Sequence, residues 1–161
     1  MTKSPEDAAA DRDAAVRTIL DALPSFVSAV VQLNELIAER MGVVPTDLHC
    51  LHELRRFGPT TARDLADRLG RSPGAVSRMI DRLDAAGCVS RADDPDDRRR
   101  VLITPTGHGL RRVADYYAGL TARTRDDLAD LDEDGLRALA GFLHAGHDST
   151  HAEIVRLRST R

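Results

Sequence analysis

The residues most suited to binding chemistry in this sequence are arginines, and they gather in the middle of the chain. From Arg55 to Arg100 there are eleven arginines and eight acidic residues, whereas the whole chain of 161 residues has a net charge of −3. The residues outside this segment therefore carry an excess of acidic groups. Guanidinium groups bind phosphate through paired hydrogen bonds. A basic segment between acidic ends is expected when one part of a protein contacts phosphate and other parts contact protein or water.

The first group of candidate residues surrounds the segment SPGAVSR. Ser72 can cap a helix, and the proline after it suits the first helical position, so a helix is predicted from Pro73 to about Ala86. Unpaired N–H groups at the start of such a helix attract phosphate. Gly74 has no side chain to obstruct entry into a DNA major groove, which is about 12 Å wide, and Arg78 could bind guanine with two hydrogen bonds. The candidate DNA contacts here are Arg71, Ser72, Pro73, Gly74, Ser77, Arg78 and Arg82.

The arginines of this helix also have a purely structural interpretation. Arg78 and Arg82 could pair with Asp81 or Asp84 and simply solvate an exposed helix face. The helix alone does not separate the two interpretations, and a second basic cluster favours the DNA-binding one.

This second cluster follows the turn sequence DDPDD and begins the segment RRRVLIT. Turn composition and β-branched residues predict a hairpin with strands over 88–91 and 98–104. Alternation along a strand would place Arg98 and Arg100 on one side and Arg99 on the other, so that one set pairs with acids while the other points outward. An arginine at a hairpin tip suits a narrow minor groove. The candidate DNA contacts here are Asp97, Arg98 and Arg99.

Residues 45–107, which contain both clusters, are expected to form a compact lobe. Two short helices joined by a tight glycine turn and followed by a hairpin, or wing, make a winged helix-turn-helix. The second of these helices should bury its apolar face, which consists of Val76, Met79, Ile80 and Leu83. Residues expected to begin or end the helices of the lobe, or to cap the helix after it, are Thr46, Gly58, Thr61 with Asp64, Gly70, Ser72, Gly87 and Thr106.

Long helices are predicted at both ends of the chain. After a flexible acidic tail over residues 1–12, apolar residues spaced by three and four predict a helix over 13–44 that Pro24 kinks or breaks. The same spacing predicts helices over 108–158, the last from about Asp134. The lobe is too small to cover these stripes, so we expect them to pair with each other and with a second copy of the chain. The residues expected in this dimer contact are Leu20, Val27, Leu136, Leu139, Leu143, Ile154 and Leu157.

The run TARDLADRLGRSPGAVSRMIDRLDAAGCVSRADDPDDRRRVLITPTGHGL closely resembles the MarR family of regulators, most clearly in GAVSRMIDRLDAAG and in DPDDRR followed by VLIT. The resemblance implies a mainly helical winged helix-turn-helix protein with a small β-wing, and a homodimer whose terminal helices intertwine. It also implies that recognition helices enter successive major grooves of double-stranded DNA and that wings enter the flanking minor grooves.

Individual residues match the family pattern by position. Ser72, Gly74, Ser77 and Arg78 match recognition-helix positions, and Asp97 and Arg99 match a wing pair in which the acid holds the arginine. The T-x-x-G step is assigned to Thr104 and Gly107, and Pro105 stands where the family usually has leucine. By resemblance, His49 and His52 lie near a cleft that binds small aromatic or phenolic effectors, although ordinary packing is the alternative. The implied function is a DNA-binding transcription regulator, a repressor released from a pseudo-palindromic operator by such an effector.

Other functional classes find little support in the sequence. It lacks a nucleophile elbow, a P-loop, a dinucleotide fingerprint and HExxH, so we expect neither an enzyme nor a cofactor. A winged-helix module whose arginines contact an acidic protein instead of DNA is a third possibility. His144, His147 and His151 share a helix face but lack acidic or cysteine partners for a metal. Cys50 and Cys88 are expected to be small buried residues. The acidic N-terminus and the interrupted apolar runs predict a cytoplasmic protein.

Overall fold

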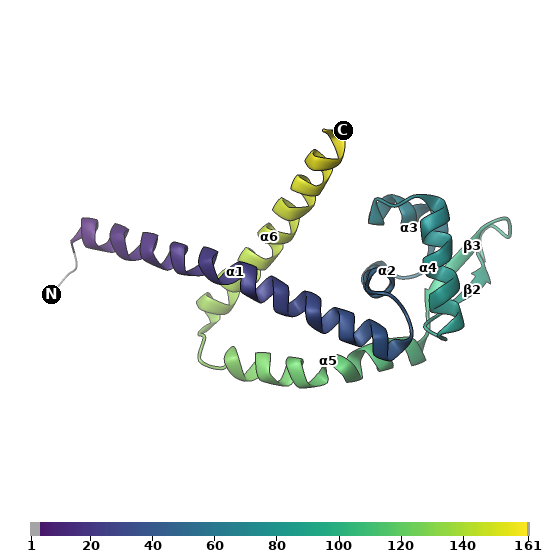
Figure 1. The fold of residues 1–161 in the computed structure, drawn as a ribbon, viewed down its shortest axis with the longest axis horizontal. Helices are drawn as coiled ribbons and strands as arrows, with labels where there is room; N and C mark the ends of the chain where they lie inside the picture. The colour runs from purple at the N-terminus through teal and green to yellow at the C-terminus, as the bar shows by residue number, and fades with distance from the viewer. Residues whose placement is uncertain (1–3, 161) are drawn as a thin grey trace. The chain divides into compact units, whose positions relative to one another are not determined.

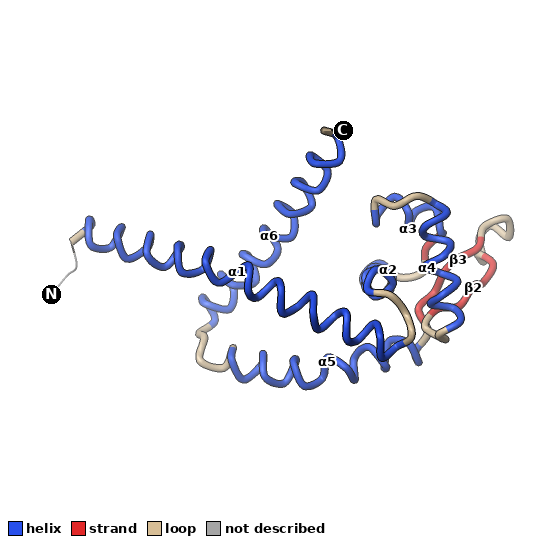
Figure 2. The backbone as a smooth tube through the Cα atoms, in the orientation of Figure 1, coloured by secondary structure: helices blue, strands red, loops and turns tan. Residues whose placement is uncertain are grey.

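The computed structural model describes residues 4–160, which form helices and one small antiparallel sheet. The chain divides into two compact units, one up to Tyr116 and one from Tyr117 onward. The predicted fold class, mainly helical with a small β-wing, is confirmed (Figure 2). The helices are α1 (Pro5–Met41), α2 (Pro45–Phe57), α3 (Ala62–Leu69), α4 (Pro73–Ala85), α5 (Gly107–Asp127) and α6 (Glu133–Ser159), and the strands are β1 (Thr60–Thr61), β2 (Val89–Asp93) and β3 (Val101–Pro105) (Figure 1).

The core of the first unit lies among α2, α3, α4 and the sheet. Leu54, Leu65 and Leu83, one from each of these helices, are completely buried. Burying a leucine side chain of this kind contributes about 1.5–3 kcal/mol. The predicted buried face of α4 is confirmed, because Val76, Met79, Ile80 and Leu83 all lie inside. This packing leaves the opposite face of α4 exposed.

The start of α1 differs from its predicted position. The helix begins at Pro5, so residues 5–12, assigned to a flexible tail, are helical, while residues 1–3 of that tail lie outside the described part. Ser4 takes the N-cap position, and Glu6 and Asp7 lie in the first turn, where negative charge favours a helix. The alanines that follow have the highest helix propensity. The acidic composition therefore accompanies a helix here.

The first two helices differ from expectation at two further points. Of the kink or break predicted at Pro24, the break does not occur, because α1 is one continuous helix through this residue. A proline removes one helical hydrogen bond, and the long helix has intact turns on both sides of it. The N-cap of α2 is Val44 and not Thr46. The carboxylate of Asp47 accepts a hydrogen bond from the Val44 N–H at 3.1 Å, and so takes the capping role. Gly58 ends α2 as predicted.

The N-caps of α3 and α4 are the residues that the sequence predicted, Thr61 and Ser72. The Thr61 hydroxyl accepts a hydrogen bond from the Asp64 N–H at 3.2 Å and donates one to the Asp64 carboxylate at 2.7 Å. Gly70 then ends α3 in the left-handed region, with φ of 57°. Two residues later Ser72 caps α4 by accepting from the Ala75 N–H at 3.3 Å. Local side chains therefore define the tight turn between the two helices.

The sheet contains one strand that the sequence did not predict. β1 pairs with β3, with Thr60 opposite Ile103, and β2 pairs with the other edge of β3. The second hairpin strand begins at Val101 and not at residue 98. The three arginines before it lie in the turn, where the Arg100 N–H donates to the Asp97 carbonyl at 2.8 Å. The predicted alternation of Arg98, Arg99 and Arg100 along a strand is therefore wrong.

A close approach at Gly109 fixes the start of α5 against the lobe. Thr106 caps α5 as predicted, because its hydroxyl accepts from the Gly109 N–H at 2.9 Å. A Cβ atom on Gly109 would lie 2.5 Å from the Cys88 Cα atom and 2.7 Å from the Cys88 carbonyl oxygen. Only glycine fits here without a backbone shift.

Replacing Gly109 with alanine is therefore expected to destabilise the protein by about 1–3 kcal/mol, the usual cost of overpacking. Gly119→Ala is the matched control in the same helix, because its Cβ would meet only the flexible Arg123 side chain, at 3.5 Å. The control should gain about 0.5–1 kcal/mol from removal of a helical glycine. Urea unfolding of the two variants measures both changes. Equal stability of the variants would contradict the close approach.

The two cysteines lie in the core of the first unit. Cys50 and Cys88 are both fully buried. Burial, with a smaller effect of the nearby Asp47 carboxylate, raises the pKa of the Cys50 thiol to about 12. Burial also raises the pKa of the Cys88 thiol. Because thiolates and not thiols are nucleophilic, both groups should be inert in the folded protein.

We therefore expect the native protein at pH 8 to release almost no chromophore from a thiol-reactive disulfide reagent. After denaturation in guanidinium chloride, both thiols should react. The stoichiometry before and after unfolding, read from absorbance, measures the difference. Rapid labelling of the native chain would show that one cysteine is accessible and ionised.

One helix has the composition of a membrane span. Within Ala9–Met41, α1 is long enough to cross a bilayer, and its most apolar stretch has a mean hydropathy of 1.5. Length and composition alone do not identify a membrane span, because core helices of soluble proteins and signal sequences meet the same criterion. The apolar side chains of α1 include Leu20 and Val27, which are exposed in the single chain.

Candidate nucleic-acid interface

The exposed start of α4 presents small and polar residues to solvent. Ser72, Pro73 and Gly74 are all exposed. A Cβ atom at Gly74 would meet only the Arg78 side chain, at 3.9 Å, so nothing crowds this end of the helix. The Ser77 hydroxyl donates to the Pro73 carbonyl at 3.0 Å, and its oxygen can still accept a hydrogen bond. The helix dipole adds partial positive charge at this end of α4.

Several arginines of the lobe are held by carboxylates. The guanidinium of Arg82 binds Asp47 on α2 with two hydrogen bonds, of 2.6 and 2.8 Å. This hydrogen bonding raises the pKa of Arg82. On the next strand, Arg91 pairs with Asp81, and also with Asp84 at 3.4 Å. These contacts join α4 to α2 and to β2.

Arg71, Arg78 and Arg98 differ from this group. All three are exposed, and none of them forms an ion pair with another residue of the 4–160 range. The alternative in which Arg78 pairs with Asp81 or Asp84 does not occur, since Arg91 binds both acids. The three arginines are therefore available to an external anion.

The wing arginine Arg99 points outward while an acid orients it. The Asp97 carboxylate accepts hydrogen bonds from the Arg99 N–H and from its Nε atom, each at 3.1 Å. The side-chain hydrogen bond from Arg99 is the main reason that the pKa of Asp97 is lowered. The side chain of Arg99 is nevertheless 91% exposed. The contact between acid and arginine that the family resemblance implies is thus present.

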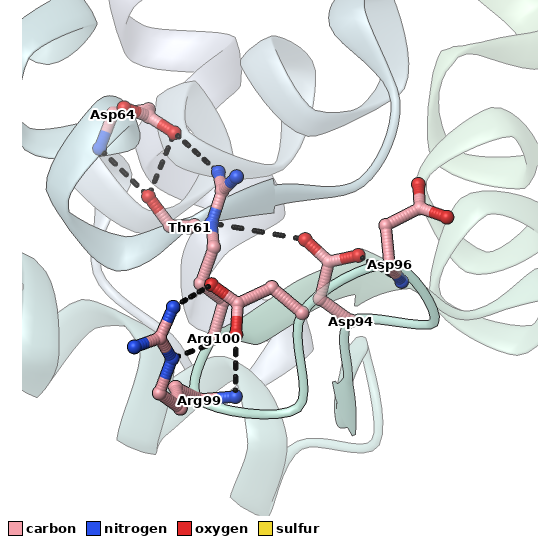
Figure 3. Close-up of polar contacts among 7 residues, drawn as sticks. Thr61, Asp64, Asp94, Asp96, Arg99 and Arg100 are labelled. Carbon is pink, nitrogen blue, oxygen red and sulfur yellow. Dashed lines mark hydrogen bonds and ion pairs between the residues drawn. The ribbon is translucent and has the colours of Figure 1, made fainter.

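Arg100, which was not among the predicted DNA contacts, pairs with acids at the base of the wing. Its guanidinium lies between Asp94 of the wing and Asp64 of α3, at 3.7 Å from each carboxylate (Figure 3). Asp94 is buried and also accepts a hydrogen bond from the Asp96 N–H at 3.0 Å. Arg100 thereby links the hairpin to the first helix of the helix-turn-helix.

The histidines considered for an effector or a metal lie outside this surface. On α2, His49 is exposed and His52 is half-buried, and burial is the main cause of the lowered pKa of His52. Within the second unit, an open hollow of about 660 Å³ is lined by Leu120, Thr121, Thr124, Arg125, Leu128, Ala129 and Leu136, and by neither histidine. His144, His147 and His151 all lie on α6, where His147 contacts the Asp148 carboxylate at 3.0 Å.

This chain is similar in sequence to known proteins. A family model described as the MarR family matches residues 37–101. The uncharacterized HTH-type transcriptional regulator YcgE of Bacillus subtilis (strain 168) is 32% identical over 142 residues, covering 88% of this chain and 92% of that protein. The HTH-type transcriptional repressor MdtR of the same strain is 30% identical over 96 residues, covering 60% of this chain and 62% of that protein.

The fold is also shared with solved structures. A MarR family protein from Bacillus stearothermophilus superposes with a TM-score of 0.64 at 16% identity, covering 86% of this chain and 97% of that one. The sequence relatives are transcription regulators, which confirms the expectation that the chain is not an enzyme. The family model, the near full-length match to a regulator and the common fold show that this chain belongs to the MarR family of DNA-binding transcription regulators.

Proposed function

We propose that the chain acts in the cytoplasm as a homodimeric repressor that binds a pseudo-palindromic operator. In this proposal α4 enters the major groove, with Arg78 contacting base edges, and the wing places Arg98 and Arg99 in the minor groove. The observation that carries it is a contrast among the arginines of α4 and the wing: Arg82, Arg91 and Arg100 are held by acids. Arg71, Arg78 and Arg98 have no ion pair within residues 4–160.

The exposed apolar residues of the terminal helices support the dimer. None of the described residues of α6, a helix of 27 residues, is buried in the single chain. Leu143, Leu157 and Leu20 are 58%, 57% and 59% exposed. An apolar stripe of this length needs a partner surface to be stable in water. Val27, Leu136, Leu139 and Ile154, the other residues of the proposed dimer contact, are exposed as well.

Repression and release by a ligand complete the proposal. The relative MdtR is named a repressor, which favours the same direction of control here. A small aromatic or phenolic effector bound beside the lobe, where His49 and His52 are the candidate contacts, would change the spacing of the two recognition helices. Because a ligand favours the state that it binds more tightly, affinity for the operator would fall.

The test is selection of bound fragments from the source genome by the purified protein. The proposal expects enrichment of one motif with two-fold symmetry and half-sites about one helical turn apart, roughly 34–36 Å. The logarithm of the association constant for that motif should fall linearly with the logarithm of the salt concentration. The slope of this line, the salt slope, should correspond to contacts with several phosphates. A module that binds only acidic proteins would give no enriched motif, and that result would refute the proposal.

A further inference from the structure

The contact between Asp47 and Arg82 is unlike the other ion pairs of the lobe. The Asp47 side chain is completely buried, whereas the carboxylates that pair with Arg91, Arg99 and Arg100 all retain some exposure. Both oxygens of Asp47 accept from Arg82, through Nε at 2.8 Å and Nη2 at 2.6 Å. We call this pair of parallel hydrogen bonds between Arg82 and Asp47 the fork. Two parallel bonds fix the direction of the guanidinium as well as its position.

Asp47 is itself fixed by the start of α2. Its carboxylate caps the helix by accepting from the Val44 N–H at 3.1 Å, and its own N–H donates to the Val44 carbonyl at 2.8 Å. Val44 belongs to the short link that joins α1 to α2. One buried carboxylate therefore holds both the junction of the first two helices and a side chain of the recognition helix, 35 residues away in sequence.

Arg82 follows Arg78 by one helical turn, and the two side chains share a face of α4. If Arg82 turned to a DNA phosphate, Asp47 would remain as a buried charge without its partner, which is strongly unfavourable. Resting on the proposed function, we infer that Arg82 is a positioning residue: its fork to Asp47 sets the rotation of α4 so that Arg78, one turn earlier, meets base edges. This replaces the role of DNA contact that the sequence suggested for Arg82.

The test uses the full-length protein, the duplex recovered by genomic selection and a scrambled duplex of equal length. Asp47→Asn removes a negative charge from the DNA-binding lobe, so long-range electrostatics alone would strengthen binding. The inference expects the opposite: affinity for the recovered duplex falls about tenfold or more, equivalent to about 1.4 kcal/mol. Affinity for the scrambled duplex should hardly change. The matched control is Asp67→Asn on α3, which makes the same change of charge and should not weaken binding.

Arg82→Lys is the second variant, and it retains the positive charge but cannot form the fork. The inference expects it to lose preference for the recovered duplex as Asp47→Asn does, with the salt slope unchanged, because no phosphate contact is lost. The ratio of the two affinities is insensitive to the fraction of folded protein, and circular dichroism sets a temperature at which each variant is folded.

The outcomes separate this inference from the proposed function. If either variant keeps the wild-type ratio of affinities, or if Arg82→Lys lowers the salt slope, the positioning role is wrong. If the wild-type protein itself shows no preference between the two duplexes, the proposed function fails before the variants are considered.

Discussion

Replacing Arg78 with alanine is expected to remove most of the sequence preference at one base pair of each half-site. Arg78 is exposed on α4, beside an uncrowded helix start, and forms no ion pair within the described range. A bidentate contact from arginine to guanine contributes about 1–3 kcal/mol of discrimination. Binding titrations with the recovered duplex and with single-base variants of it measure the loss. Unchanged discrimination would mean that Arg78 does not read the sequence.

Arg99→Ala is the comparison for Arg78→Ala, because Arg99 belongs to the wing and is proposed to lie in the minor groove near phosphates. Its loss should weaken binding to many sequences alike and reduce the magnitude of the salt slope by about one for each chain. The pair of variants thus separates base reading from phosphate contact. If both proteins bound DNA as wild type does, the surface assigned to DNA would be wrong.

Replacing Leu143 with aspartate is expected to have the largest effect of any substitution described. Leu143 is 58% exposed in the single chain and lies in the apolar stripe of α6. A carboxylate without a partner is costly to bury in an apolar contact, so the dimer should dissociate. A monomer offers one recognition helix, and affinity for the operator should fall toward the level of non-specific binding, a loss of about 10³ or more. Gel filtration and DNA titration measure the two effects.

Ala145→Asp provides the matched control for this substitution. It adds the same charge two residues away, about 200° further round the helix and hence nearly opposite the stripe. The control should remain dimeric and bind DNA with an affinity close to that of wild type. Dissociation by both variants would indicate general destabilisation of α6, and dissociation by neither would place the dimer contact elsewhere.

The parts of the lobe that the sequence predicted well depend on local chemistry. Ser72 with Pro73 begins α4, Thr61 with Asp64 begins α3, and Gly70 separates the two helices. Each of these features involves residues within about one turn of one another, so residue type and spacing are sufficient to recognise it. The buried face of α4 follows from helical periodicity in the same way.

The parts that the sequence missed depend on contacts between distant segments. β1 contains only two residues and exists because Thr60 and Thr61 pair with β3. The contact of Arg82 with Asp47 was not predicted, because Asp47 lies 35 residues earlier in the sequence. Arg100 is likewise held by Asp64 on α3. The fold brings charged side chains together with partners that are distant in sequence. Their roles can therefore be assigned only once the positions of the helices are known.

Two elements, β3 and α1, begin at other residues than the sequence predicted. The arginines before Val101 were placed in a strand, whereas the turn hydrogen bond from Arg100 to Asp97 keeps them outside it. At the N-terminus, acidic composition suggested an irregular tail, although Pro5 and the alanines after Asp7 favour a helix. Element ends are decided by small differences in local free energy, which composition alone does not resolve.

The proposed function requires two chains that together hold a pair of recognition helices at the spacing of DNA half-sites. Sedimentation equilibrium of the purified protein over the micromolar range measures whether this dimer forms. We expect a single species of twice the 17.6 kDa chain mass. A species of one chain mass throughout that range would contradict it.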